Sequence, residues 1–427
     1  MKALLDIVAR HKRGQRVGVY SLCSAHPLVI EAAMREAVKT RTPLLIEATC
    51  NQVNQFGGYT GMKPADFHAF VEALATKTGL PHDRLLLGGD HLGPNVWQAE
   101  PAATAMDKAD ELVAQYVAAG FRKIHLDCSM ACAEDPVPLP ESLIAARAAR
   151  LAAVAEKTAR SAGGELPVYV IGTEVPVPGG AHEELAALEV TRPEAALATI
   201  AAHRAAFDAA GLADAWLRVI ALVVQPGVEF DHHKVIDYEP AKAGALRSCI
   251  ERERQIVFEA HSTDYQTPRS LAQLVRDHFA ILKVGPGATF ALRETLWALA
   301  AIEDDMPGIE TRSALRAVAL RVMRENPAQW RGHYRHSDGD AHSQAFDLAY
   351  SLSDRIRYYW PHPELQSACE TLLDNLRRRP PPLTLVSQYL PRQYEAVRAH
   401  ELEPGVDELL RDGVAAAIRP YIHACGA

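Results

Sequence analysis

Histidines and carboxylates stand at the ends of several short apolar runs in this chain of 427 residues. Asp90 and His91 end one such run, and Glu259 and His261 end another. Imidazole and carboxylate groups bind divalent metal ions, and carboxylates also exchange protons with a substrate. Alternatively, the histidine of each pair is a structural residue at the edge of the core, with its ring hydrogen-bonded to backbone groups. If the pairs meet in space, they predict a metal-assisted acid–base site.

Two further run ends carry groups of the same kind. His125 and Asp127 occupy alternate positions, so they share one face of a strand. They either face the mouth of the fold or form a buried ion pair that only supports it. Glu174 ends the next run and could bind a metal ion. Gly179 and Gly180 follow and could bring backbone N–H groups close to an anion, although a Gly-Gly pair is usually only a turn.

Together, four run ends offer two imidazoles and two carboxylates as metal ligands: His91, Glu174, Glu229 and His261. This set suits a divalent ion with one open coordination position, Zn²⁺ first and Mn²⁺ or Ni²⁺ as alternatives. Gln225 or His232 could take the place of Glu229. Such an ion would polarise a carbonyl group of the substrate. Around it, we expect three carboxylates to be catalytic: Asp90, Asp127 and Glu259.

The elements that must position these groups are eight near-continuous apolar runs, typical of parallel strands buried on both faces. They are Val17–Ala25, Pro43–Thr49, Arg84–Asp90, Lys123–Ser129, Val168–Glu174, Arg218–Gln225, Gln255–His261 and Ala280–Gly285. Helical patterns separate them. Eight repeats of strand and helix favour a (β/α)₈ TIM barrel, whose active site lies at the C-terminal ends of the strands. A doubly wound sheet is the alternative, but no GxGxxG follows the first run.

The alternation of strand and helix stops after Gly308. We therefore predict a barrel over residues 1–308 and a helical extension over residues 309–427 that packs on it. Gly285 and Gly287 open the last helix of the barrel, where N–H groups and the helix dipole favour an anion such as phosphate. The alternative is a plain turn. Arg355 and Arg357, in the extension, could reach over the mouth and bind the substrate, or form surface or interface ion pairs.

Lys283 lies inside the last apolar run. A desolvated lysine can lose its proton and form a Schiff base with a ketone. An ion pair with a carboxylate at a strand end is the alternative, and we favour it.

The composition excludes several classes of function. The formal net charge is −8, which gives no basic surface for nucleic acid. No apolar run is long enough to span a membrane. Residues 1–13 mix charged and apolar side chains, which predicts an amphipathic helix rather than a secretion signal. The seven cysteines include no CxxC pair, as expected for reduced thiols in the cytoplasm.

Several longer stretches resemble one known family. They are Gly18–Pro27, Ile46–Gln55, Gly88–Asn95, Gly172–Pro176, Phe258–Gln266 and Asp354–Trp360. Over nearly its whole length, the chain resembles the Z-type subunit of class II D-tagatose-1,6-bisphosphate aldolase, the GatZ/KbaZ family. The resemblance implies a barrel of the class II aldolase type. Glu47 and Asn51, in the second stretch, and Ser262, in the fifth, are expected to contact the substrate.

The resemblance to class II aldolases also implies roles for single residues. Asp90 and His91 match an Asp-His step in which the aspartate carries protons and the histidine binds zinc. His261 falls near a second zinc ligand, and Gly285 near the phosphate loop. Class II aldolases carry a glutamate and a Gly-Gly pair after their fifth strand, and Glu174, Gly179 and Gly180 resemble these residues. Two positions depart from the pattern, because Gly88 and Glu229 stand where those enzymes carry histidines.

Three functions follow as hypotheses. The first is the Z-type protein of the aldolase system, which acts on a ketohexose or its phosphate. It would assemble with a Y-type subunit and form a homo-oligomer. The second is an autonomous ketohexose 4-epimerase that cleaves and re-forms the C3–C4 bond. The third is a non-catalytic stabilising subunit. Some relatives carry a tagatose-6-phosphate kinase label, but no GxxxxGK[ST] motif occurs here, so we discount kinase activity.

Overall fold

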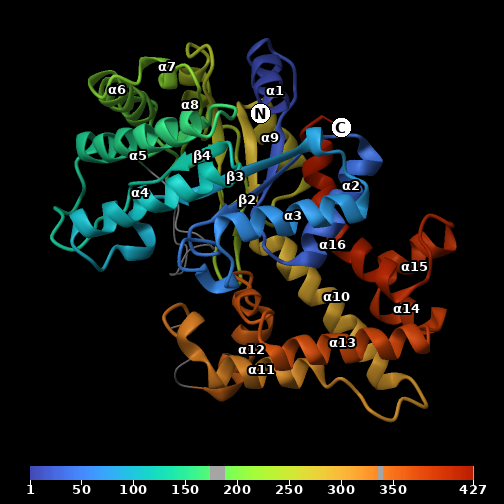
Figure 1. The fold of residues 1–427 in the computed structure, drawn as a ribbon. Helices are drawn as coiled ribbons and strands as arrows, with labels where there is room; N and C mark the ends of the chain where they lie inside the picture. Colours follow the sequence, from blue (N-terminus) through green and yellow to red (C-terminus); the bar gives the residue numbers. More distant parts are fainter. Residues whose placement is uncertain (174–187, 335–339, 427) are drawn as a thin grey trace.

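Eight parallel strands close into a barrel in the computed structural model, which describes residues 1–173, 188–334 and 340–426 (Figure 1). In order around the barrel the strands are β1 (Val19–Leu22), β10 (Phe279–Val284), β9 (Val257–Ala260), β6 (Val219–Val223), β5 (Val168–Ile171), β4 (Lys123–Leu126), β3 (Leu85–Leu92) and β2 (Leu44–Thr49). Nearly every strand residue is buried, as the continuous apolar runs require. The predicted TIM barrel is confirmed.

Helices surround the barrel and return the chain from one strand to the next. They are α2 (Pro27–Thr40), α3 (Pro64–Thr78), α4 (Ala102–Ala118), α5 (Glu141–Ser161), α6 (Pro193–Ala209), α7 (Ala213–Trp216), α8 (Gly244–Ile250), α9 (Pro268–Arg276) and α10 (Pro286–Asp305). Proline stands in the first turn of α2, α3, α6, α9 and α10, where its missing N–H costs no hydrogen bond. A two-stranded hairpin, β7 (Glu229–Phe230) and β8 (Val235–Ile236), follows β6.

The end of the barrel away from the site is closed by α1 (Lys2–Lys12). Leu4, Ile7 and Val8 pack against apolar side chains of the barrel interior, among them Leu45 and Leu86. The amphipathic helix predicted over residues 1–13 is therefore present, and its apolar face is a plug. Among the described residues, no helix has both the length and the apolar character needed to cross a membrane.

A layer of buried charge lies above this apolar plug, inside the barrel. The ammonium group of Lys123, on β4, lies 2.5 Å from Oε1 of Glu47 on β2 and 2.7 Å from Oε2 of Glu259 on β9. All three side chains are fully buried. One ammonium group thus pairs with carboxylates from two other strands of the barrel.

Replacing Lys123 by methionine is expected to destabilise the protein by about 3–5 kcal/mol, because it leaves the buried Glu259 without its nearest counter-ion and Glu47 paired with Lys283 alone. Urea unfolding followed by circular dichroism would measure the loss. Lys108 pairs with Glu100 on the surface, where an ion pair contributes about 1 kcal/mol or less, so Lys108→Met is the matched control. Equal losses in the two variants would contradict a structural role for the buried layer.

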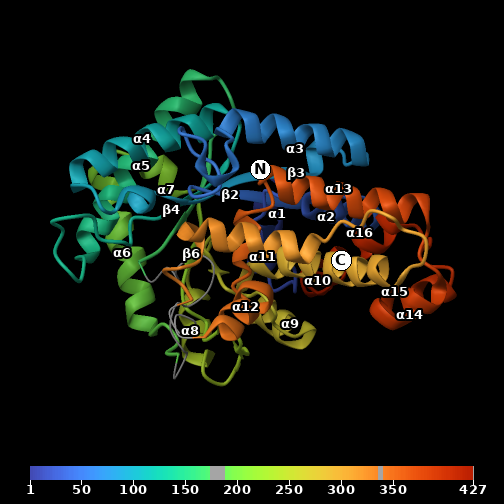
Figure 2. The same ribbon diagram turned by 90° about the horizontal axis from the view of Figure 1, so that it is seen from below.

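The remaining helices form an extension, of which α11 (Leu315–Glu325), α12 (Ala341–Tyr350) and α13 (Pro363–Arg378) lie at the end of the barrel opposite α1 (Figures 1 and 2). The others are α14 (Leu383–Tyr389), α15 (Pro391–Arg398) and α16 (Val406–Ala424). The last of them, α16, returns to the barrel and packs on α2, α9 and α10. The Tyr421 hydroxyl on α16 donates a 2.6 Å hydrogen bond to the carbonyl of Thr263, beside the site. The predicted division at residue 308 remains a prediction.

Candidate active site

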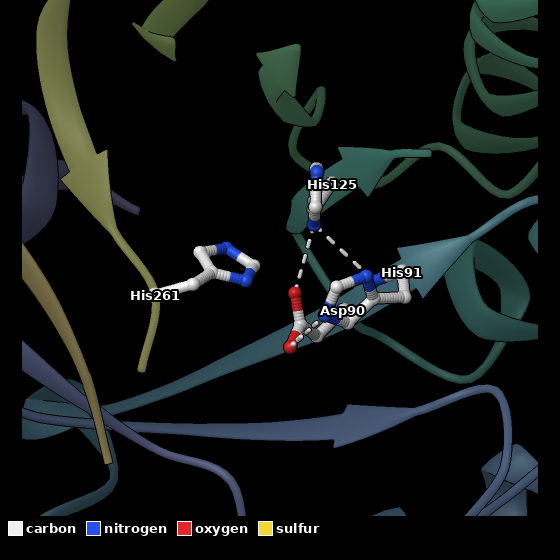
Figure 3. Close-up of side chains that lie close together, drawn as sticks. All are labelled: Asp90, His91, His125 and His261. Atoms are coloured by element: carbon white, nitrogen blue, oxygen red, sulfur yellow. Dashed lines mark hydrogen bonds and ion pairs between the residues drawn. The ribbon is translucent and has the colours of Figure 1, made fainter. Parts of the chain in front are cut away.

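Three imidazoles and one carboxylate meet at the mouth of the barrel (Figure 3). They belong to Asp90, His91, His125 and His261, and one ligand atom from each lies within 4.8 Å of the others. The four side chains are between 0% and 5% exposed. Asp90 and His91 lie on β3, His125 lies on β4, and His261 directly follows β9. The structure thus brings together three predicted residues and adds His125, for which the sequence left open an ion-pair role.

Asp90 and His91 are neighbours, and on a regular strand their side chains would point to opposite faces. His91 has a φ of 50°, in the left-handed region, and the register between β3 and β4 shifts between Gly89 and Leu92. Such an irregularity redirects a side chain, and it often lies at a functional site. It allows both residues to reach the same cluster.

Asp127 supports the ring of His91. Its Oδ2 lies 2.7 Å from His91 Nδ1 and accepts a 2.8 Å hydrogen bond from Asn95. Its Oδ1 accepts from the backbone and hydroxyl of Ser129. Burial alone would raise the pKa of Asp127, but His91 lowers it well below the usual range. Asp127 therefore orients the ring of His91, in the arrangement that carboxylates adopt beside metal-binding histidines. The predicted catalytic role has no support in these contacts.

His125 contacts the cluster through one nitrogen and leaves the other without a partner. Its Nδ1 lies 2.8 Å from Asp90 Oδ1. Its Nε2 is buried and has no hydrogen-bond partner among the described residues. An unsatisfied buried nitrogen costs free energy unless a ligand occupies it.

Lys283 and Glu259 complete the surroundings of the cluster. The ammonium group of Lys283 pairs with Glu47 and lies 2.9 Å from Asp90 Oδ2. Burial would lower its pKa, but Asp90 and the other nearby acidic groups hold it well above the usual range. A lysine that keeps its proton is no nucleophile, so these contacts support the ion pair over Schiff-base chemistry. Glu259 Oε1 lies 3.1 Å from His261 Nε2, so Glu259 also orients a ring.

A cavity of about 80 Å³ lies beside the cluster and is lined by Asp90, His91 and His261. Among the predicted substrate contacts, Asn51, Ser262 and Gly285 also line it. Glu47 lies beneath it, fully buried between the two lysines. A neighbouring pocket of about 440 Å³ reaches between the barrel and α13.

The extension contributes one of its two predicted arginines to the cavity. Arg357 lines both spaces. It belongs to a 3₁₀ turn, η6 (Arg355–Tyr358). Arg355 instead donates to the carbonyl of Gln329 and does not line the 80 Å³ cavity. Of the two predicted arginines, Arg357 therefore faces the cavity, and its contact with a substrate remains a prediction.

Comparison with known proteins agrees with this barrel. A family model described as "D-tagatose-1,6-bisphosphate aldolase subunit GatZ/KbaZ-like" matches residues 4–426. The chain belongs to this family. A crystal structure of a probable tagatose 6 phosphate kinase from Sinorhizobium meliloti 1021 is 50% identical, covers 96% of this chain and 100% of its own, and superposes with a TM-score of 0.88.

Two aldolases of known structure are more distant. The fructose-bisphosphate aldolase of Campylobacter jejuni is 14% identical over 87% of this chain and 91% of its own, with a TM-score of 0.45. The YdjI aldolase of Escherichia coli K12 is 10% identical over 85% of this chain and 97% of its own, with a TM-score of 0.40.

In this GatZ/KbaZ-like chain, the packing of Glu47 against position 88 requires glycine there. A Cβ added there would lie 2.8 Å from Glu47 Oε1. Any larger side chain would therefore collide with the carboxylate that pairs with both buried lysines. Glycine at this position leaves room for the buried charge layer.

Glu229 does not join the cluster in this GatZ/KbaZ-like protein. It lies on β7, beyond the end of β6, and its Oε1 accepts a 3.0 Å hydrogen bond from the N–H of Phe230. Burial raises its pKa to about 7. The proposed substitutes are also engaged elsewhere, since Gln225 accepts from Gly227 and His232 contacts Ser351. The structure gives no support to Glu229 as a ligand. The predicted Glu174, Gly179 and Gly180 lie outside the described residues.

The predicted phosphate site at the start of α10 is also occupied by the protein itself. The N–H groups of Gly285 and Gly287 both donate to Oδ1 of Asp264, at 2.9 and 2.7 Å. The two amides are therefore not free for a phosphate, contrary to the prediction. Sequence patterns identified the helix start but not its partner, because Asp264 comes from the loop after β9.

Proposed function

We propose that this GatZ/KbaZ-like protein cleaves and re-forms the C3–C4 bond of a ketohexose with the help of a divalent metal ion, and so interconverts two sugars that differ at C4. The observation that carries the proposal is the cluster of Asp90, His91, His125 and His261 beside a cavity. A subunit that only stabilises a partner needs no such set at its mouth.

The cluster fits a divalent ion by its chemistry. Three imidazoles and a carboxylate are a donor set that Zn²⁺ accepts, with Mn²⁺ or Ni²⁺ as alternatives. His125 Nε2 is buried without a partner, while the other two rings are fixed by Asp127 and Glu259. His91, His125 and His261 would hold the ion. When bound, it would polarise the ketose carbonyl and stabilise the negative charge that develops on its oxygen.

Asp90 is placed to move the proton. Burial would raise its pKa, but His91 and Lys283 lower it well below the usual range, so the carboxylate is ionised. It takes the proton of the C4 hydroxyl as the C3–C4 bond breaks and the aldehyde forms. If the aldehyde turns before C3 attacks its other face, Asp90 returns the proton to the new C4 hydroxyl. The cycle then inverts C4 and consumes nothing.

Product analysis tests this function. Purified protein, loaded in turn with Zn²⁺, Mn²⁺ and Ni²⁺, is incubated with tagatose, fructose and their phosphates. We expect the C4 epimer of at least one sugar to accumulate toward equilibrium without any added protein. Chelation of the metal should stop the conversion, and renewed metal should restore it. If no epimer forms under any of these conditions, the proposal is wrong.

The second candidate is support of a Y-type aldolase subunit, which the description of the family favours. In that case the protein would raise the activity or stability of the partner and form no epimer alone. Metal-free protein with the same supporting effect would identify the non-catalytic role. In either role we place the protein in the cytoplasm, where its free thiols stay reduced.

A further inference from the structure

The start of α10 holds a carboxylate of the protein where an anionic ligand would otherwise bind. Asp264 Oδ1 accepts both amides that a phosphate would use, those of Gly285 and Gly287. The Asp264 side chain is 3% exposed and lines the cavity beside the histidine cluster. A Cβ on Gly287 would lie 3.1 Å from Oδ1, so glycine permits this close approach.

The loop that carries Asp264 is fixed on both sides. The Thr263 hydroxyl donates a 2.5 Å hydrogen bond to the carbonyl of Lys283 on β10. The carbonyl of Thr263 accepts the hydroxyl of Tyr421 from α16. The backbone that carries Asp264 therefore cannot shift without breaking contacts to two other elements, and the carboxylate itself is held by the amides of Gly285 and Gly287. A phosphate brought to this place would lose both amide donors and would face a carboxylate of like charge.

We infer that the end of the substrate that reaches α10 carries a hydroxyl group, so the protein accepts a free or singly phosphorylated ketohexose and rejects a ketohexose 1,6-bisphosphate. The inference rests on the proposed function. A hydroxyl can donate to the Asp264 carboxylate, whereas a phosphate dianion cannot. The conclusion does not depend on which end of the sugar lies at α10, because a bisphosphate carries phosphate at both ends. Asp264 is thus the residue that determines this specificity.

Ligand binding to the metal-loaded protein tests the inference. Calorimetric titration would compare tagatose 1,6-bisphosphate, tagatose 6-phosphate, tagatose 1-phosphate and tagatose in the parent protein. We expect the better of the two monophosphates, or the free sugar, to bind at least about tenfold more tightly than the bisphosphate. The reason is that a phosphate of the bisphosphate at α10 would meet the like charge of Asp264 and would lack the two amide hydrogen bonds that otherwise bind it. Equal or tighter binding of the bisphosphate would overturn the inference.

Two variants separate the charge of Asp264 from its size. In Asp264→Gly both amides are freed, and affinity for the bisphosphate and for inorganic phosphate should rise on the order of tenfold. Asp264→Asn keeps an acceptor of the same shape, so the amides stay occupied and the gain should be smaller. Metal content and melting temperature verify that each variant is folded. A folded glycine variant with no gain for either phosphate would show that Asp264 is not the barrier.

These binding results are independent of turnover. If no epimer forms but the bisphosphate is rejected until Asp264 is removed, the proposed function fails and the specificity assignment stands. If epimerisation occurs and the bisphosphate binds as well as the monophosphates, only the specificity assignment fails.

Discussion

Asp90→Asn is expected to lower the rate of C4 epimerisation by about 10² to 10⁴-fold, the usual contribution of a positioned acid–base group. Asparagine has nearly the same shape and can still accept the contact from His125, which lies 2.8 Å from Oδ1. It cannot accept the proton of the C4 hydroxyl. The measurement is the initial rate of epimer formation at saturating sugar, at matched metal content.

A buried acid remote from the cluster provides the control. Asp277 is 1% exposed and is held by Tyr238 and Arg247, so Asp277→Asn tests for a general effect of removing a buried charge. We expect it to change stability but not the rate per folded molecule. Full activity in Asp90→Asn would exclude Asp90 as the proton carrier. Loss of metal in that variant would instead make it a ligand.

His125→Ala is expected to remove the metal ion and, with it, all measurable turnover. The reason is that a three-imidazole set reduced to two loses most of its affinity for a divalent ion. By elemental analysis, the metal content of the purified variant should be a small fraction of the roughly one ion per chain expected in the parent protein. The parent protein prepared in parallel sets the reference.

His203→Ala is the matched control for this loss. His203 is also fully buried, and its Nε2 also has no partner among the described residues. Its Nδ1, however, contacts only the carbonyl of Thr199 on its own helix, and it belongs to no group of metal-competent side chains in the described chain. The control should keep its metal. Retention of a full metal complement by His125→Ala would contradict the assigned centre.

Much of the fold was predictable because the strands are buried on both faces and therefore appear as uninterrupted apolar runs. The runs around β2 and β10 match the observed strands to within one residue at their starts. Asp90, His91 and His261 were predictable for the same reason, since each stands where an apolar run ends. Residues at such ends converge in any closed parallel barrel.

The rest depends on contacts between segments distant in sequence. His125 was grouped with Asp127 because the two share a predicted strand, whereas its contact with the cluster is made to Asp90 on the neighbouring strand β3. Glu229 was counted as the end of a strand, but β6 ends at Val223 and leaves it on a separate hairpin. The occupied start of α10 requires two loops to be packed together. Spacing along a chain contains none of this information.

The packing of α16 has a consequence for how the protein is made. This helix packs on α2, α9 and α10 and so holds the first and last parts of the barrel together. It is synthesised after every barrel strand, and β1 must pair with β10 to close the ring. During synthesis, the seam between β1 and β10 therefore stays unsupported until residues 406–424 have emerged. Overproduction should for this reason benefit from slower synthesis, and truncation before residue 406 should yield aggregated chains.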